Sequence, residues 1–174
     1  TREAQKDTYG AIIEKGGSPL YLFNAGGYES GELKAEGVVD GKVVTTHTVR
    51  TPGAPHHVEV VVPDHPVIPV ADGSDMIPVY FIICDENGTR VNTSDAEIRI
   101  TVTGEGTLIG DGIRRIGINP QRVEGGVGFA FVRTTKKAGR ITLTATSEGL
   151  QSGKTEITTR RFEGEELPDG YNRP

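Results

Sequence analysis

The stretch from Ala71 to Gly106 constrains the fold most strongly, because it holds two apolar runs on either side of one polar turn. The runs are Ile77–Cys84 and Ile98–Val102. Both are rich in Ile and Val, and the first adds Tyr and Phe, residues that suit a pleated, half-buried surface. The turn opens with Asp85-Glu86-Asn87-Gly88, which are typical turn residues. The stretch therefore predicts two antiparallel strands of a β-sandwich.

The glycine and proline content points to the same fold class. The 174 residues include 24 Gly and 10 Pro, and the hydrophobic fraction, which does not count Gly, is 34%. Many short strands joined by Gly/Pro turns give such a composition. No long segment repeats apolar residues with the period of a helix. We therefore expect an all-β fold.

A proline-rich segment between Pro63 and Pro69 is the best candidate for a domain boundary, since proline cannot sit in a central β-ladder. It predicts a small β-sandwich domain at residues 1–63, whose opening strands are expected to lie outside this chain. A second β-sandwich follows at residues 70–161. The acidic segment at 162–174 is expected to be a loose tail.

Four segments supply expected strands of the first domain. Leu20–Asn24 is a short apolar run and predicts a buried strand. Leu33–Val39 and Lys42–Arg50 flank Asp40-Gly41, which is a strong signal for a β-hairpin. His57–Val62 is the last strand before the boundary.

The run Ile77–Cys84 is apolar on both faces, which predicts a contact surface. Ile77, Val79, Phe81 and Ile83 alternate onto the face expected to point into the core. The outer face of a sandwich strand is usually polar, but here another domain or a partner is expected to cover it. The expected domain-contact residues on this outer face are Tyr80, Ile82 and Cys84. Cys84 is the single cysteine, so no internal disulfide is expected and it is interpreted as a small hydrophobic residue.

Charge and hydropathy exclude two classes of partner. The net charge is −5, and basic residues cluster only as doublets, so no nucleic-acid partner is expected. No run of 18 apolar residues occurs, so no membrane-spanning helix is expected.

No catalytic constellation is visible in the sequence. Acid–base catalysis by carboxyl groups needs two of them close together in a cleft, whereas the acidic residues here fall mainly in turns and on polar strand faces. His56 and His57 are adjacent on a predicted strand and should point to opposite faces, so no metal site is expected from them. Calcium stays open as an alternative at the turn residues Asp72, Asp75, Asp85 and Asn87. We expect no catalytic residues, no metal and no cofactor.

Sugar binding would require an exposed aromatic ring, because such a ring can stack on a sugar face. The chain has no Trp and five Tyr. Tyr28 lies in a Gly-rich loop and is the best candidate for a carbohydrate contact.

Several short motifs follow one another in the second domain: Ala71-Asp72-Gly73, the turn at 85–88 with Val91, Gly104-Glu105-Gly106, Ala138-Gly139 and Ile141–Ala145. Through these motifs the domain resembles a bacterial immunoglobulin-like domain, and more narrowly the C-terminal immunoglobulin-like domain of family 2 glycoside hydrolases, the β-galactosidase group. The first domain resembles the small β-sandwich that follows the catalytic barrel in that family, through Gly31–Ala35, Asp40–Lys42 and Thr51–Pro55.

This resemblance implies two immunoglobulin-like β-sandwich domains in tandem and a non-catalytic C-terminal accessory region. Such a region would brace the catalytic barrel of the parent enzyme, which is the expected partner, and would help to shape its cleft or its oligomer contacts. A bacterial, periplasmic or extracellular location is expected. Two alternatives stay open: a carbohydrate-binding module with a polysaccharide partner, and an adhesin-type stalk domain.

Overall fold

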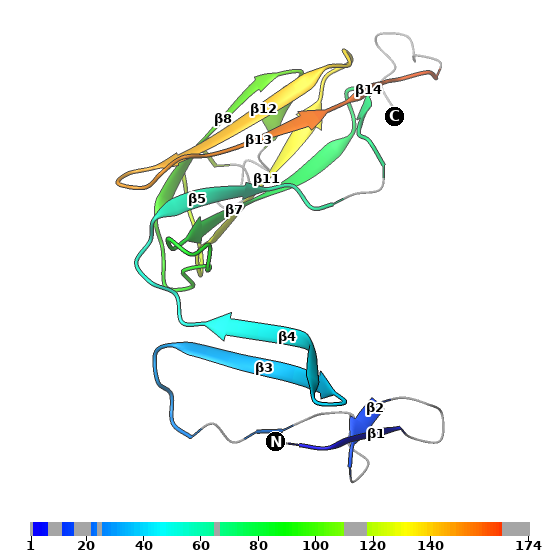
Figure 1. Ribbon diagram of the computed structural model, residues 1–174. Coiled ribbons are helices and arrows are strands. Elements are labelled where there is room, and N and C mark those ends of the chain that lie inside the picture. The colour runs from blue at the N-terminus through cyan, green and yellow to red at the C-terminus, as the bar shows by residue number, and fades with distance from the viewer. Residues whose placement is uncertain are drawn as a thin grey trace, which may run out of the picture. The chain divides into compact units, whose positions relative to one another are not determined.

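A computed structural model describes residues 2–6, 12–15, 22–23, 26–64, 67–109 and 118–164 (Figure 1). All regular structure in these residues is β-strand, which confirms the expected all-β fold. The chain divides into two compact units, Thr1–Glu32 and Leu33–Pro174.

The described residues of the first unit include a short antiparallel ladder. Strands β1 (Ala4–Lys6) and β2 (Ile12–Glu14) pair with Ala4 opposite Glu14. Of the predicted strand at 20–24 only residues 22 and 23 are described, and they lie outside any strand. Leu22 is 69% exposed and Phe23 63% exposed, so these two side chains are not buried as expected.

The predicted hairpin is present in the second unit. Strands β3 (Glu32–Val39) and β4 (Lys42–Arg50) are joined by Asp40 and Gly41, whose φ angles are 49° and 74°. These left-handed angles are those that a two-residue hairpin turn requires. Apart from Gly37, which is half-buried, every residue of the two strands is exposed.

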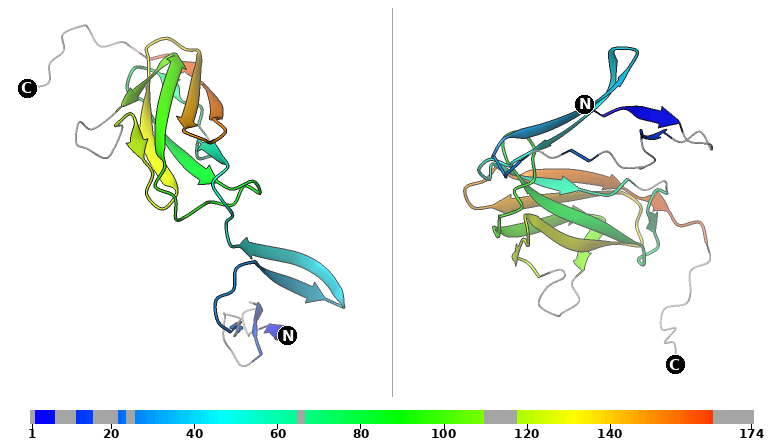
Figure 2. Two further views of the ribbon diagram at one scale, coloured as in Figure 1. Left: turned by 90° about the vertical axis from the view of Figure 1, so that its left-hand side faces the viewer. Right: turned by 90° about the horizontal axis from the view of Figure 1, so that it is seen from below.

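The rest of this unit forms a β-sandwich of two four-stranded sheets (Figures 1 and 2). The first sheet has the order β5 (His57–Val61), β7 (Met76–Cys84), β11 (Val127–Thr134) and β9 (Gly106–Ile109). The second has the order β10 (Gln121–Arg122), β8 (Glu97–Gly104), β12 (Arg140–Ser147) and β13 (Gly153–Thr158). All neighbours within these sheets are antiparallel. Strands β6 (Val70–Ala71) and β14 (Arg160–Arg161) form a separate parallel pair.

One strand is assigned differently by the structure than by the sequence. The boundary at residue 63 places His57–Val62 in the first domain, but β5 pairs with β7 over its whole length, from His57 opposite Cys84 to Val61 opposite Tyr80. Val58 is buried in the core of the sandwich and Val60 packs against it. The strand therefore belongs to the second domain, and its assignment to the first is corrected. A small sandwich at the N-terminus stays a prediction.

The two apolar runs Ile77–Cys84 and Ile98–Val102 face each other across the core. Their strands, β7 and β8, lie in different sheets of the sandwich. As predicted, Ile77, Val79, Phe81 and Ile83 point inward and are at most 5% exposed. The buried side chains that the second sheet contributes are Ile98, Ile100, Ile141, Leu143, Ala145 and Ile157.

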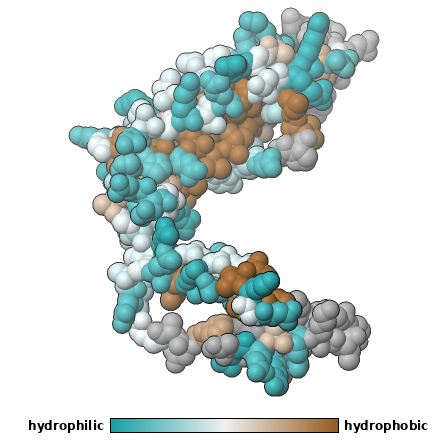
Figure 3. Space-filling model, viewed as in Figure 1, coloured by the Kyte–Doolittle hydropathy of each residue, from teal (hydrophilic) through white to brown (hydrophobic). Residues whose placement is uncertain are grey.

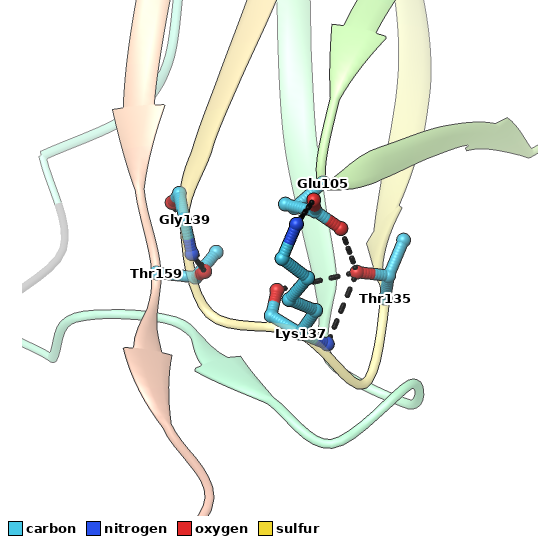
Figure 4. A network of polar contacts seen from close by, with 5 residues as sticks. All are labelled: Glu105, Thr135, Lys137, Gly139 and Thr159. Carbon is cyan, nitrogen blue, oxygen red and sulfur yellow. Dashed lines mark hydrogen bonds and ion pairs between the residues drawn. The ribbon is translucent and has the colours of Figure 1, made fainter.

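Polar contacts between turns tie one end of the sandwich together (Figure 4). Glu105, between β8 and β9, accepts a hydrogen bond of 2.8 Å from the Thr135 hydroxyl and pairs with the Lys137 ammonium at 2.9 Å. Hydrogen bonds from Lys137 and Thr135 lower the pKa of Glu105 from its ordinary value. On the other side of the turn, the Gly139 N–H donates to the Thr159 hydroxyl at 3.0 Å.

Candidate interaction surface

The outer side of the first sheet carries an aromatic and aliphatic surface. On β11, small or aliphatic residues (Gly128, Ala130, Val132) alternate into the interior, so Phe129 and Phe131 point outward. In the ladder Phe129 lies opposite Tyr80, and Tyr80 lies opposite Val61 on the other side. We call this surface the aromatic face; its residues are Val61, Pro78, Tyr80, Ile82, Phe129 and Phe131.

The rings of the aromatic face are in contact. The Tyr80 and Phe129 centroids are 5.0 Å apart, and those of Phe129 and Phe131 are 4.8 Å apart with nearly perpendicular planes. Tyr80 is 38% exposed, and the other members of the face are half-buried. Figure 3 shows apolar atoms open to solvent on the sandwich and on the β3–β4 hairpin. A contiguous apolar surface of this kind is typical of a contact with another protein surface.

Of the three predicted contact residues, two lie on this face and one is buried. Tyr80 lies at its centre and Ile82 lies nearer the end of β7, while Cys84 is 1% exposed. The Cys84 thiol donates a hydrogen bond to the Glu59 carboxylate at 3.6 Å. Burial, reinforced by the charge of Glu59, raises the pKa of this thiol to about 11. A partner could therefore reach Tyr80 and Ile82 directly, and the contact role of all three residues stays a prediction.

The outer side of the second sheet is polar. Thr142 lies opposite Thr103 and Thr144 opposite Thr101, which places four threonines side by side on β8 and β12. Charged residues next to them are paired: the Glu156 carboxylate forms ion pairs with the Arg140 guanidinium at 3.0 Å and with the Lys154 ammonium at 3.2 Å. This surface, the threonine face, has the composition expected of a solvated sheet.

The turn aspartates are held by backbone N–H groups. Asp85 is 3% exposed, and its carboxylate accepts hydrogen bonds from the N–H groups of Gly53, Asn87 and Thr89 at 2.8–2.9 Å. These bonds, the one from Gly53 first, lower the pKa of Asp85. Asp72 and Asp75 also accept backbone N–H bonds. Each carboxylate thus has a structural role in its own turn, and in the described residues no three potential metal ligands are grouped.

The two adjacent histidines do not diverge as the sequence predicts. The Nδ1 atoms of His56 and His57 are 3.3 Å apart, and the Nε2 of His56 lies 3.3 Å from the Gln151 side-chain amide. Strand β5 begins only at His57, so the alternation of a strand does not apply to His56. The contact joins the start of β5 to the residues before β13.

Two further features bear on ligand binding. Tyr28 is 83% exposed, as a sugar-stacking residue would have to be. An open hollow of about 590 Å³ lies at one end of the second sheet and contains the 3.0 Å ion pair of Arg122 with Asp95. Its lining includes acidic, basic and hydroxyl side chains but no aromatic ring, so it offers no stacking platform for a sugar.

The part of the chain that the structure describes contains no helix that could span a membrane.

Comparison with known proteins places the sandwich in one family. Residues 60–156, more than half of the chain, match the model of the glycoside hydrolase family 2 C-terminal domain 5. The β-galactosidase of Thermoanaerobacter pseudethanolicus is 36% identical over 115 residues, which are 66% of this chain and 14% of the relative. The β-glucuronidase of Formosa agariphila is 27% identical over 142 residues, which are 76% of this chain and 14% of the relative.

Solved structures agree on the fold. A glycosyl hydrolase family 2 member from Bacteroides cellulosilyticus superposes with a TM-score of 0.63 at 24% identity, covering 77% of this chain and 18% of that one. The segment that matches the Thermoanaerobacter and Formosa enzymes spans only about a seventh of the length of either relative.

Proposed function

Because the chain belongs to glycoside hydrolase family 2 as a C-terminal domain, we propose that it is a non-catalytic accessory region that braces the catalytic barrel of a larger enzyme. The parent enzyme would be a β-galactosidase-like glycoside hydrolase of a bacterium, working in the periplasm or outside the cell. The region would also help to shape the cleft of the barrel or the oligomer contacts of the enzyme. About six-sevenths of the length of the two relatives lies outside the matched segment, which leaves room for such a barrel.

The aromatic face is the observation that carries this proposal. Its rings lie on the solvent side of a sheet whose other side already forms the core. Burying a large apolar side chain stabilises a contact by about 1.5–3 kcal/mol when burial is complete. Tyr80, Phe129 and Phe131 are already partly covered, so each would contribute a fraction of that amount. A surface that packs over these three rings would thus hold the barrel and this sandwich together.

The test compares one substitution on each outer face of the sandwich, made in the full-length parent enzyme. Tyr80→Asp places a charge in the aromatic face, and Thr144→Asp places the same charge on the threonine face of β12. We expect Tyr80→Asp to shorten the half-life of glycosidase activity at raised temperature, while Thr144→Asp leaves it unchanged. In the 174-residue chain alone both variants should stay folded by circular dichroism. Equal half-lives for the two parent variants would refute the brace.

Carbohydrate binding is a second candidate, and the exposure of Tyr28 favours it. The measurement is calorimetric titration of the folded 174-residue chain with galactans and simple galactosides. Saturable heat that disappears in Tyr28→Ala would identify a binding module. No heat with any of these sugars would leave the brace as the function.

A further inference from the structure

Two side chains of opposite charge border the aromatic face. Glu59 is the middle residue of β5 and lies opposite Ile82, near the end of β7. Arg133 is near the end of β11 and lies opposite Met76, the first residue of β7. From Met76 to Ile82 the strand advances six residues, or roughly 20 Å at the rise of a β-strand. The acid and the base therefore lie at diagonally opposite corners of the face, too far apart to pair with each other.

Neither charge is neutralised by an opposite charge among the described residues. The Glu59 carboxylate accepts only the weak hydrogen bond of the Cys84 thiol, and the next ionisable group on the same strand face is His57. The Nδ1 of His57 is directed to His56. Arg133 is exposed, and on the neighbouring strand β9 it lies opposite Thr107.

The threonine face shows the opposite arrangement. There Glu156 lies between two basic groups, Arg140 at 3.0 Å and Lys154 at 3.2 Å. Those charges are satisfied within the domain. An opposite charge for Glu59 or for Arg133 at the aromatic face would have to come from outside the described residues.

Covering the aromatic face would remove water from Glu59 and Arg133. A charge that loses its hydration without gaining a partner costs several kcal/mol. Interfaces avoid this cost by placing an opposite charge across the contact, around an apolar centre. The cover must therefore match this face in charge as well as in hydrophobicity.

We propose that the barrel surface packed against the aromatic face is apolar at its centre and carries a basic side chain opposite Glu59 and an acidic one opposite Arg133. This inference rests on the proposed bracing function and adds the chemistry of the partner. Arginine suits the position opposite Glu59, because its planar guanidinium can bind a carboxylate through two hydrogen bonds. Two opposite charges at diagonal corners also permit only one of the two end-to-end orientations of the barrel surface.

The experiment measures how fast hydroxyl radicals oxidise Met76 and Tyr80 in the full-length parent and in the 174-residue chain. Tyr80 belongs to the aromatic face and Met76 borders it, and they are 38% and 46% exposed in the chain, so both side chains report whether the face is covered. In the wild-type parent we expect both to be protected, while Phe162, which is 37% exposed and outside this face, serves as the internal reference.

Charge reversal then tests the complementarity. In the parent, Glu59→Lys and Arg133→Glu should each raise the oxidation rate of Tyr80 by about tenfold or more, as expected when a charge pair in a contact is reversed. Added salt should reduce this difference, because a pair at the rim of a contact is partly screened. Glu97→Lys, on the exposed start of β8 in the other sheet, makes the same change in net charge as Glu59→Lys and should have no effect.

The outcomes separate this inference from the function on which it rests. If Met76 and Tyr80 are as reactive in the wild-type parent as in the chain, the bracing function itself fails. If they are protected, and Tyr80→Asp raises the oxidation rate of Met76 while Glu59→Lys and Arg133→Glu raise neither rate, bracing stands and the charge complementarity is overturned.

Discussion

The two outer faces of the sandwich enclose one core but differ in chemistry. The aromatic face presents three rings in contact and unpaired charges at its corners. The threonine face presents aligned threonines and paired charges. An antiparallel sheet normally packs one side on the core and solvates the other. The second sheet follows this rule, and the first departs from it.

The difference between the two faces separates the residues that folding requires from those that it does not require. Both sheets need apolar residues on their inner sides, and both have them. Nothing in the fold of this domain requires rings on the outer side of β7 and β11, since threonine serves that position on β8 and β12. The rings therefore point to a requirement beyond the folding of the domain.

The largest effect on stability is expected from a substitution in the core that lies between the two sheets. Phe81 is fully buried on the inner side of β7, next to the outward Tyr80. Phe81→Ala should destabilise the chain by about 3–5 kcal/mol, because it removes contacts and leaves a cavity. Tyr80→Ala should cost far less, since its ring is partly in water and already lies outside the core. Urea unfolding of the 174-residue chain measures both.

Similar losses in the two variants would contradict this comparison. They would mean that the aromatic face supports the fold of the isolated domain as strongly as the core does. The outer rings would then need no partner to explain them.

A smaller loss is expected at the turn that ends β7. Asp85→Ala leaves the N–H groups of Gly53, Asn87 and Thr89 without their acceptor, so the urea midpoint should fall, though less than for Phe81→Ala. The wild-type turn should also respond to acid. Since the folded pKa of Asp85 is lowered, its stabilisation is complete above the ordinary value of 3.8 and disappears as pH falls through the lowered pKa.

Urea midpoints of wild type and Asp85→Ala across the acid range check this prediction. The gap between the two curves should be constant near neutral pH and should narrow below about pH 4. Asp95→Ala, which removes an exposed ion pair with Arg122, is the control and should show a small gap at every pH. A gap for Asp85→Ala that does not narrow in acid would show that its carboxylate charge is not what holds the turn.

Most of the sandwich could be predicted from the sequence because its strands alternate. The inward residues of Ile77–Ile83 and of Ile141–Ala145 are all apolar, and both segments are in strands of the structure. The Asp40-Gly41 hairpin was predictable as well, because only a few residue types adopt its left-handed angles. These signals are local, and the fold preserves them.

The features that sequence did not predict depend on long-range pairing. Pro63–Pro69 looks like a boundary from its composition, yet β5, which precedes it, pairs with β7, which follows it. Phe129 and Phe131 are larger than Gly128 and Ala130 and would be assigned to the core by size alone. The small residues occupy the inner side instead, where Gly128 lies so close to Ile98 and Val123 that an added Cβ would be only 3.0 and 3.4 Å from them. That proximity cannot be inferred from a single strand.

An exchange of residue types between the faces should give an effect of about 1–3 kcal/mol on the free energy of unfolding. Phe129→Thr removes two aromatic contacts, each worth about 0.5–1.5 kcal/mol, and places a threonine where the other sheet has one. Thr144→Val makes the reverse change and should alter stability by less than about 0.5 kcal/mol.

Binding of a hydrophobic dye measures how much apolar surface is accessible to solvent in the same two variants. Phe129→Thr should lower the fluorescence of the dye with the folded chain, and Thr144→Val should raise it slightly. If Phe129→Thr leaves the dye signal unchanged, the apolar surface that solvent reaches does not centre on the rings of the aromatic face.

The smallest effect is expected at the ion pairs of the threonine face. Arg140 and Glu156 are 69% and 40% exposed, and exposed pairs contribute about 0.2–1 kcal/mol. Arg140→Gln should therefore shift the urea midpoint by an amount near the error of measurement, and salt should remove the shift. A loss well above 1 kcal/mol that persists in high salt would show that the charges of this face hold the second sheet together. In that case the first sheet, where Glu59 and Arg133 have no ion-pair partner among the described residues, would lack a stabilising contribution that the second sheet has.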